Sequence, residues 1–217
     1  GYEIIAQENR ITVYARFQSA GLAGKTIVLD AGHGGEDGGA AANGGCEKDV
    51  NLALTKDLTS FLSLTPYTVN PTRTDDRLLY GAGQENRKKY YDLVERVRFA
   101  SQFDNAVFIS IHQNKYSQSS ACGTQVFYGR NCPESKELAE MLQKTITGYL
   151  QPENKREIKQ ATKDIYLLYQ ATKPAVMVEC GFLSNAAEAE KLTDGEYQDQ
   201  IAFSICMALM NCLADQS

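Results

Sequence analysis

Both histidines of the chain follow apolar segments that have the composition of buried strands. His33 comes after "KTIVLD", inside a loop with five glycines, and His112 closes "AVFISIH". Two glutamates are placed similarly: Glu179 closes "KPAVMVE", and Glu47 opens a helical segment after the glycine loop. Two neutral imidazoles and a carboxylate make a complete protein ligand set for a catalytic zinc, and a second carboxylate can act as general base.

Each of these residues also has a structural explanation. A histidine after a glycine-rich turn is often structural, and Glu47 could be only an acid favoured in the first turn of a helix. Glu179 is harder to explain in this way, because a carboxylate at the end of a buried strand needs a partner or a raised pKa. Cys46 is a substitute candidate ligand, whereas Cys180 should point to the opposite side of the strand from Glu179.

The elements that must position these residues alternate between strands and helices. Apolar β-branched runs predict strands, and apolar residues at helical spacing predict helices. This alternation indicates one α/β domain with a mostly parallel sheet and helices on both faces, whose site lies beyond the carboxyl ends of the strands. The predicted strands are 10–17, 25–30, 67–73, 106–112, 123–129 and 173–179, and the predicted helices are 47–63, 90–103, 133–150 and about 197–213.

Competing motifs for the glycine loop do not fit their required context. The stretch "GLAGKT" leads into a strand and has Ser19 where a phosphate-binding loop needs its first glycine. The sequence has no H-E-x-x-H motif and no G-x-S-x-G elbow, which argues against a zincin or a serine hydrolase. The polar stretch 75–89 is predicted to be an exposed loop, either simply solvated or gripping a ligand.

Composition excludes several classes of protein. The 217 residues carry a net charge of -5 without a basic run, which argues against a nucleic-acid partner. No window of eighteen consecutive apolar residues exists, so no membrane span is expected. Because the chain begins with Gly1, we expect a preceding signal or anchor to have been removed. Among six cysteines, Cys122 and Cys132 are spaced for a disulfide across a hairpin.

The motifs resemble those of a known family. "TIVLDAGHGGEDGGA", "CEKDVNLAL", "TRTDD", "VFISIHQN" and "PAVMVECGFLSNAAEAEKL" occur in this order. Together they resemble the zinc-dependent N-acetylmuramoyl-L-alanine amidases of the amidase-3 type, from about Lys25 to Leu213. The resemblance is greater to the germination-specific, spore-cortex branch of clostridial Firmicutes. We therefore expect an N-terminal arm or edge strand over residues 1–24 and the catalytic domain over 25–215.

The resemblance implies the roles of the site residues. His33, Glu47 and His112 would bind one Zn²⁺ per chain, and Glu179 would be the catalytic acid/base. It further implies a six-stranded sheet and a peptidoglycan substrate, cut at the amide between N-acetylmuramic acid and L-alanine of the stem peptide. In the cortex branch, this cut precedes the formation of muramic-δ-lactam. Asn114, two residues past His112, could contact substrate or brace its loop.

Such a substrate implies an exported protein that acts in the cell wall or the spore envelope, at the outer face of the forespore membrane. Between His112 and Lys173 the sequence predicts one strand, one helix and a short linker, which leaves no autoinhibitory insertion and predicts an open site. A regulatory partner protein is compatible with the sequence. The alternatives are a vegetative cell-separation amidase and a catalytically inactive module that binds the wall or activates another hydrolase.

Overall fold

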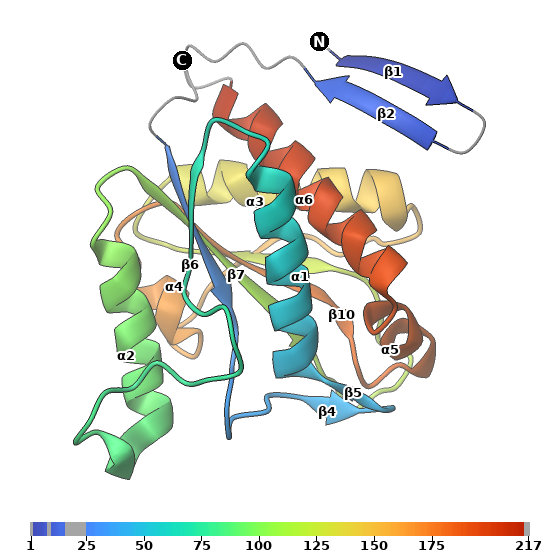
Figure 1. The fold of residues 1–217 in the computed structure, drawn as a ribbon. Helices are drawn as coiled ribbons and strands as arrows, with labels where there is room; N and C mark the ends of the chain where they lie inside the picture. The colour runs from blue at the N-terminus through green and yellow to red at the C-terminus, as the bar shows by residue number, and fades with distance from the viewer. Residues whose placement is uncertain (1, 8–9, 16–24, 215–217) are drawn as a thin grey trace.

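A six-stranded sheet forms the centre of the computed structural model, which describes residues 2–7, 10–15 and 25–214 (Figure 1). Four neighbouring strands run parallel, β8 runs antiparallel to β10, and β9 pairs in parallel with β8. The strand order is β6 (Thr68–Pro71), β3 (Thr26–Ala31), β7 (Ala106–Asn114), β10 (Ala175–Phe182), β8 (Gln125–Tyr128) and β9 (Lys159–Gln160).

Helices cover both faces of this sheet and bury its apolar side chains in two clusters. One face carries α1 (Glu47–Leu62), α3 (Glu134–Leu150), α5 (Ala186–Leu192) and α6 (Gly195–Ala214). The other face carries α2 (Lys88–Ser101) and α4 (Tyr166–Gln170). Figure 1 shows α1 and α6 side by side over the sheet, with α2 apart from them. The predicted single α/β domain with a mostly parallel six-stranded sheet is therefore confirmed.

The alternation of side chains along the strands brings polar residues to one sheet edge. Val28, Phe108 and Met177 pack into the cluster beneath α2 and α4. Because the side-chain period of a strand is two residues, His112 and Glu179 lie further along β7 and β10 on that same face. These two residues are direct register partners, so the sheet itself sets their side chains next to each other.

Several short elements were not predicted from the sequence. They are β4 (Ala41–Ala42), β5 (Gly45–Cys46), β9, α4, α5 and a single turn of 3-10 helix, η2 (Glu85–Arg87), within the predicted loop 75–89. The segment from His112 to Lys173 thus holds β9 and α4 besides the predicted strand and helix, so its description as a plain short linker is corrected. Helix α2 begins two residues before the predicted residue 90.

The N-terminal segment forms a small sheet of its own. Strands β1 (Tyr2–Gln7) and β2 (Arg10–Ala15) pair antiparallel with each other. Residues 16 and 17, the end of the predicted strand 10–17, lie outside the described residues. The division of the chain at residue 24 stays a prediction.

Two further findings concern the cysteines and the helices. The hypothesised disulfide is not formed: Cys122 and Cys132 are free thiols, and the Cys132 thiol contacts Glu134 Oε2 at 2.8 Å. Among the described helices, none combines the length and the apolar character that crossing a bilayer requires.

Candidate metal centre

Three of the predicted site residues meet at the carboxyl edge of the sheet. His33 lies in the loop after β3, Glu47 is the first residue of α1, and His112 lies on β7. One potential ligand atom from each lies within 4.8 Å of the others. Glu47 Oε1 is 2.8 Å from His112 Nδ1 and 3.3 Å from His33 Nε2. Residues 79 positions apart in the sequence therefore form one compact group of nitrogen and oxygen donors.

Two glycines of the loop make this approach sterically possible. A Cβ on Gly32 would lie 2.2 Å from His112 Nε2, inside the imidazole ring's own space. A Cβ on Gly39 would lie 2.5 Å from Glu47 Oε2 and 2.6 Å from His33 Cδ2, and Gly39 also has a φ of +66°. The glycine density of "AGHGGEDGG" thus serves to let the loop backbone lie against the three side chains.

The carboxylate of Glu47 is buried and saturated with hydrogen bonds. Its Oε2 accepts the Ala40 N–H at 2.6 Å, and its Oε1 accepts the Gln113 N–H at 3.1 Å. Burial by itself would raise the pKa of Glu47, but the hydrogen bonds from His112 and His33 outweigh it and hold the pKa well below its usual value. Glu47 is therefore a permanent anion, as a metal ligand must be.

Glu179 lies beside this group in a different environment. Its Oε2 is shielded from solvent and has no hydrogen-bond partner among the described residues, and the same is true of His112 Nε2. Burial raises the pKa of Glu179 to about 7, opposed by the charge of His112 and reinforced by that of Glu47. A carboxyl with a pKa near neutrality can both accept and return a proton, which is the requirement for a general base that later acts as acid.

Two buried arginines, which no sequence motif indicated, hold the loop that carries His33. Arg96 on α2 donates to the backbone oxygens of Ala31 and His33 and forms ion pairs with the carboxylates of Asp30 and Asp92. This arrangement fixes His33 although its backbone φ is +63°, a value that residues other than glycine rarely adopt. Arg73 lies in the motif "TRTDD" and Arg96 lies on α2, and the spacing of neither residue indicates a buried role.

Arg73 performs a related task between the loop and α1. It donates to Ala31 O at 2.9 Å and Gly32 O at 3.2 Å, and also to Lys48 O at 2.7 Å. One guanidinium thereby joins the loop that carries His33 to the first turn of the helix that carries Glu47. The five donors in the rigid plane of arginine suit such a three-way bridge between carbonyl groups.

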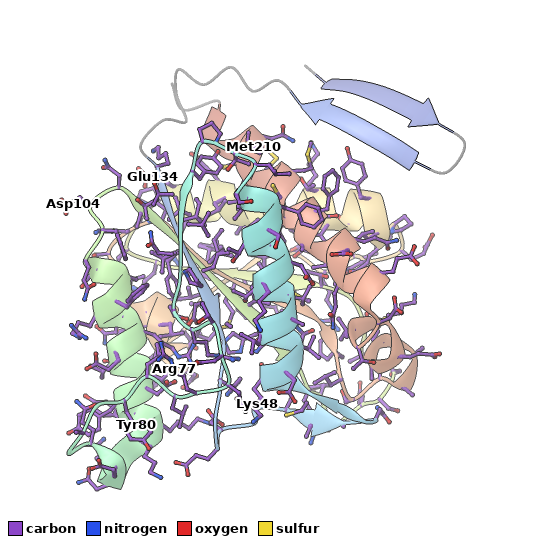
Figure 2. All side chains as sticks on the ribbon, viewed as in Figure 1. Lys48, Arg77, Tyr80, Asp104, Glu134 and Met210 are labelled. Carbon is purple, nitrogen blue, oxygen red and sulfur yellow. The ribbon has the colours of Figure 1, made fainter. Side chains whose placement is uncertain are left out.

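The segment after β6 packs over the glycine loop from outside. Asp76 accepts the Gly35 N–H at 2.7 Å and pairs with Lys48 Nζ at 2.6 Å. Figure 2 shows Lys48, Arg77 and Tyr80 at one end of the molecule, away from Asp104, Glu134 and Met210. Arg77 and Tyr80 line an open groove of about 430 Å³ beside Gly35. The predicted exposed loop is thus joined to the candidate metal centre.

The remaining candidates lie around the group. Asn114 ends β7, and its Oδ1 accepts the Lys115 N–H at 2.8 Å, a contact that braces its own loop. The Cys46 thiol contacts Gly38 O at 3.4 Å. Cys180 belongs to the apolar cluster under α1, α3 and α6, on the other face from Glu179, as the alternation predicted. Asp37, which was not predicted as a site residue, places its Oδ2 2.8 Å from His33 Nδ1.

The donor set fits a catalytic metal ion. Two imidazoles and one carboxylate match the composition of a three-ligand zinc site that keeps a position for water. The unpartnered Glu179 Oε2 next to them is the feature expected of a proton acceptor whose water is supplied by the metal. An α/β domain with these residues at its sheet edge has the residue set of a metal-dependent hydrolase.

Comparisons with known proteins show which family of hydrolases the chain belongs to. The family described as N-acetylmuramoyl-L-alanine amidase matches residues 27–211, and the chain belongs to it. The germination-specific N-acetylmuramoyl-L-alanine amidase of Bacillus subtilis (strain 168) is 34% identical over 203 residues, which cover 90% of this chain and 82% of that protein. The amidase LytC of the same organism is 33% identical over 186 residues, covering 85% of this chain and 34% of LytC.

A solved structure shares both sequence and fold. The CwlD amidase from Clostridioides difficile, solved in complex with the GerS lipoprotein, is 39% identical and superposes with a TM-score of 0.84. The match covers 88% of this chain and 99% of that one. The resemblance drawn from the motifs is therefore confirmed, and the chain is an amidase of this family.

Proposed function

We propose that the chain is a zinc-dependent amidase that cuts peptidoglycan between N-acetylmuramic acid and L-alanine of the stem peptide. The observation that carries this proposal is the His33–Glu47–His112 group beside Glu179, in a chain of the amidase family. The three residues would hold one zinc ion. When bound there, zinc would lower the pKa of a water molecule and polarise the carbonyl of the scissile amide.

Glu179 is the proposed acid/base of the reaction. Its shielded Oε2 would take the proton from the attacking water, and the carboxylic acid would then give that proton to the nitrogen of the leaving L-alanine. In the metal-free chain, burial raises the pKa of Glu179, which supports its role in returning the proton. Asn114 lies at the end of the same strand as His112, and we propose that it supports its loop at the rim of the site.

A digestion of purified peptidoglycan tests the activity. The zinc-loaded chain should release stem peptides with a free N-terminal L-alanine, detected by mass spectrometry. Treatment with a chelator should abolish this release, and added zinc should restore it. Release of sugars without peptides, or activity that survives complete removal of metal, would contradict the proposal.

We further propose that the amidase acts on spore cortex, in the spore envelope at the outer face of the forespore membrane. The support is its similarity to the germination-specific amidase of Bacillus subtilis over most of both chains. The alternative is a vegetative cell-separation amidase, and LytC, whose name carries no germination role, is similar as well. Spores of a deletion strain decide between the two: the cortex role predicts loss of muramic-δ-lactam, whereas the vegetative role predicts normal lactam and chained cells.

A regulatory partner belongs to the same proposal. The CwlD amidase was solved in complex with the GerS lipoprotein, and at 39% identity this chain is a candidate for a similar complex. The measurement is the zinc-dependent activity of the purified chain, alone and with the corresponding lipoprotein of its own organism. A partner role predicts a difference between the two rates and co-elution of the proteins in size-exclusion chromatography.

A further inference from the structure

Asp37 lies behind His33, on the far side of the ring from Glu47. His33 Nδ1 is 2.8 Å from Asp37 Oδ2, while His33 Nε2 is 3.3 Å from Glu47 Oε1. A neutral imidazole carries its proton on only one nitrogen, and a carboxylate can only accept. When a metal is bound, a proton on Nδ1 would satisfy Asp37 and leave the Nε2 lone pair for the ion, in place of the hydrogen bond that Nε2 gives Glu47 in the metal-free chain.

Asp37 is itself held in place from two directions. Its backbone N–H and C=O both pair with Gly34 at 3.0 Å, which closes a small bridge directly after His33. Its second oxygen, Oδ1, is 3.3 Å from Lys89 Nζ at the start of α2. The side chain of Asp37 is 19% exposed, so the carboxylate is a fixed group and not a freely moving surface acid.

The neighbouring residue offers an internal comparison. Glu36 pairs with Lys88 at 2.7 Å, just as Asp37 pairs with Lys89, and it comes from the same loop. The Glu36 side chain is 58% exposed, and its described ion pair is to Lys88 and not to His33. Among the described contacts, Asp37 therefore bonds to a candidate metal ligand and its neighbour Glu36 does not.

We propose that Asp37 is a positioning residue that fixes the tautomer and the ring orientation of His33 and thereby strengthens metal binding. The inference rests on the metal site of the proposed function. Carboxylates that accept from the second nitrogen of a metal-binding histidine raise its basicity and hold its ring, and their loss weakens metal affinity by about 10- to 100-fold.

The test is a competition titration of zinc against a chromophoric chelator, with the full chain and three variants. Asp37→Ala should raise the zinc Kd by about 10- to 100-fold. Asp37→Asn keeps an oxygen that can accept from Nδ1–H, so its Kd should lie between those of wild type and Asp37→Ala. Glu36→Ala should bind zinc as wild type does. Thermal unfolding of the metal-free proteins checks that each variant folds cooperatively, with a modest loss in Asp37→Ala because it removes the contacts to His33 and Lys89.

A second measurement reports the tautomer directly. The chain has only two histidines, so nitrogen NMR of the zinc-loaded protein can resolve both rings. A protected Nδ1–H signal of His33 should be present in wild type and absent in Asp37→Ala. An unchanged Kd and unchanged spectrum in Asp37→Ala, or equal weakening in Glu36→Ala, would overturn the inference. A wild-type chain that binds no zinc would instead overturn the proposed function, and this inference with it.

Discussion

The two glutamates beside the histidines have opposite pKa shifts because their surroundings differ. Glu47 receives two backbone N–H groups and both imidazoles, which favour its anion. Glu179 has an oxygen that is shielded from solvent without a partner, which favours its neutral form. Such a difference between two carboxyls supports the proposed roles, with Glu47 as ligand and Glu179 as acid/base.

The raised pKa of Glu179 has a consequence for the stability of the metal-free protein. The folded state holds a proton up to about pH 7, whereas the unfolded chain releases it near 4.5. The contribution of this group to stability is therefore complete below pH 4.5 and is lost as the pH rises to 7. Glu179→Gln has no such loss. The difference in unfolding free energy between Glu179→Gln and wild type should therefore shift in favour of the variant by up to roughly 3 kcal/mol between pH 4 and pH values above 7.

Urea unfolding of the chelator-treated proteins across pH 4 to 8 measures this difference. The gap between Glu179→Gln and wild type should widen between pH 4.5 and 7 and then stay constant. A gap that does not change with pH would show that Glu179 titrates normally in the folded protein.

The glycine loop, α1 and β7 each present one candidate ligand, and α2 holds the loop. The positions of β3, β7 and β10 could be predicted from sequence, because apolar runs define strands. Strands β7 and β10 continue to Asn114 and Phe182, beyond the predicted ends at 112 and 179. The Arg96–Asp30 ion pair could not, because it joins residues 66 positions apart that meet only after α2 packs on the sheet. Asp37 could not be recognised either, because its partner depends on the unusual φ of His33.

Gly39→Ala tests the close approach of the loop. The added Cβ would overlap Glu47 Oε2 and His33 Cδ2, and alanine disfavours a φ of +66°. We expect weaker zinc binding by at least about 10-fold and a loss of more than about 1 kcal/mol in stability. Gly148→Ala is the matched control: Gly148 lies in α3 with nothing within 4 Å of its added Cβ, and alanine there should be neutral or stabilising. Equal zinc affinity in Gly39→Ala and wild type would contradict the steric account.

Arg96→Met tests the ion pairs that anchor the loop. Removal of the guanidinium leaves Asp30 and Asp92 buried without their cation, and such uncompensated charge costs about 3–5 kcal/mol. Arg98→Met, two residues along the same helix, removes an arginine that is 65% exposed and should cost less than about 1 kcal/mol. Chemical denaturation compares the two variants, and similar losses in both would contradict a structural role for the buried network.

For the whole molecule, the alternation of strands and helices was sufficient to predict an α/β domain with helices on both faces. The antiparallel direction of β8 could not be predicted in this way. A four-residue strand has the same sequence pattern whether it pairs parallel or antiparallel with its neighbour. The short helices α4 and α5 were also missed, since segments of five and seven residues show too little helical periodicity to be recognised.

Removal of residues 1–24 tests the predicted domain division. The six-stranded sheet and both apolar clusters lie within residues 26–212, so the shortened chain should fold on its own. Its unfolding midpoint, zinc content and turnover should match those of the full chain. Loss of cooperative unfolding in the shortened chain would show that the N-terminal segment belongs to the domain.

The most direct test of the account is the turnover of zinc-loaded Glu179→Gln on purified peptidoglycan, followed by the appearance of free L-alanine amino groups. If Glu179 is the acid/base beside a metal held by His33, Glu47 and His112, the variant should keep its zinc and lose about 10²–10⁴-fold in rate. A variant that retains zinc and hydrolyses the substrate at nearly the wild-type rate would contradict the role of Glu179 as the acid/base.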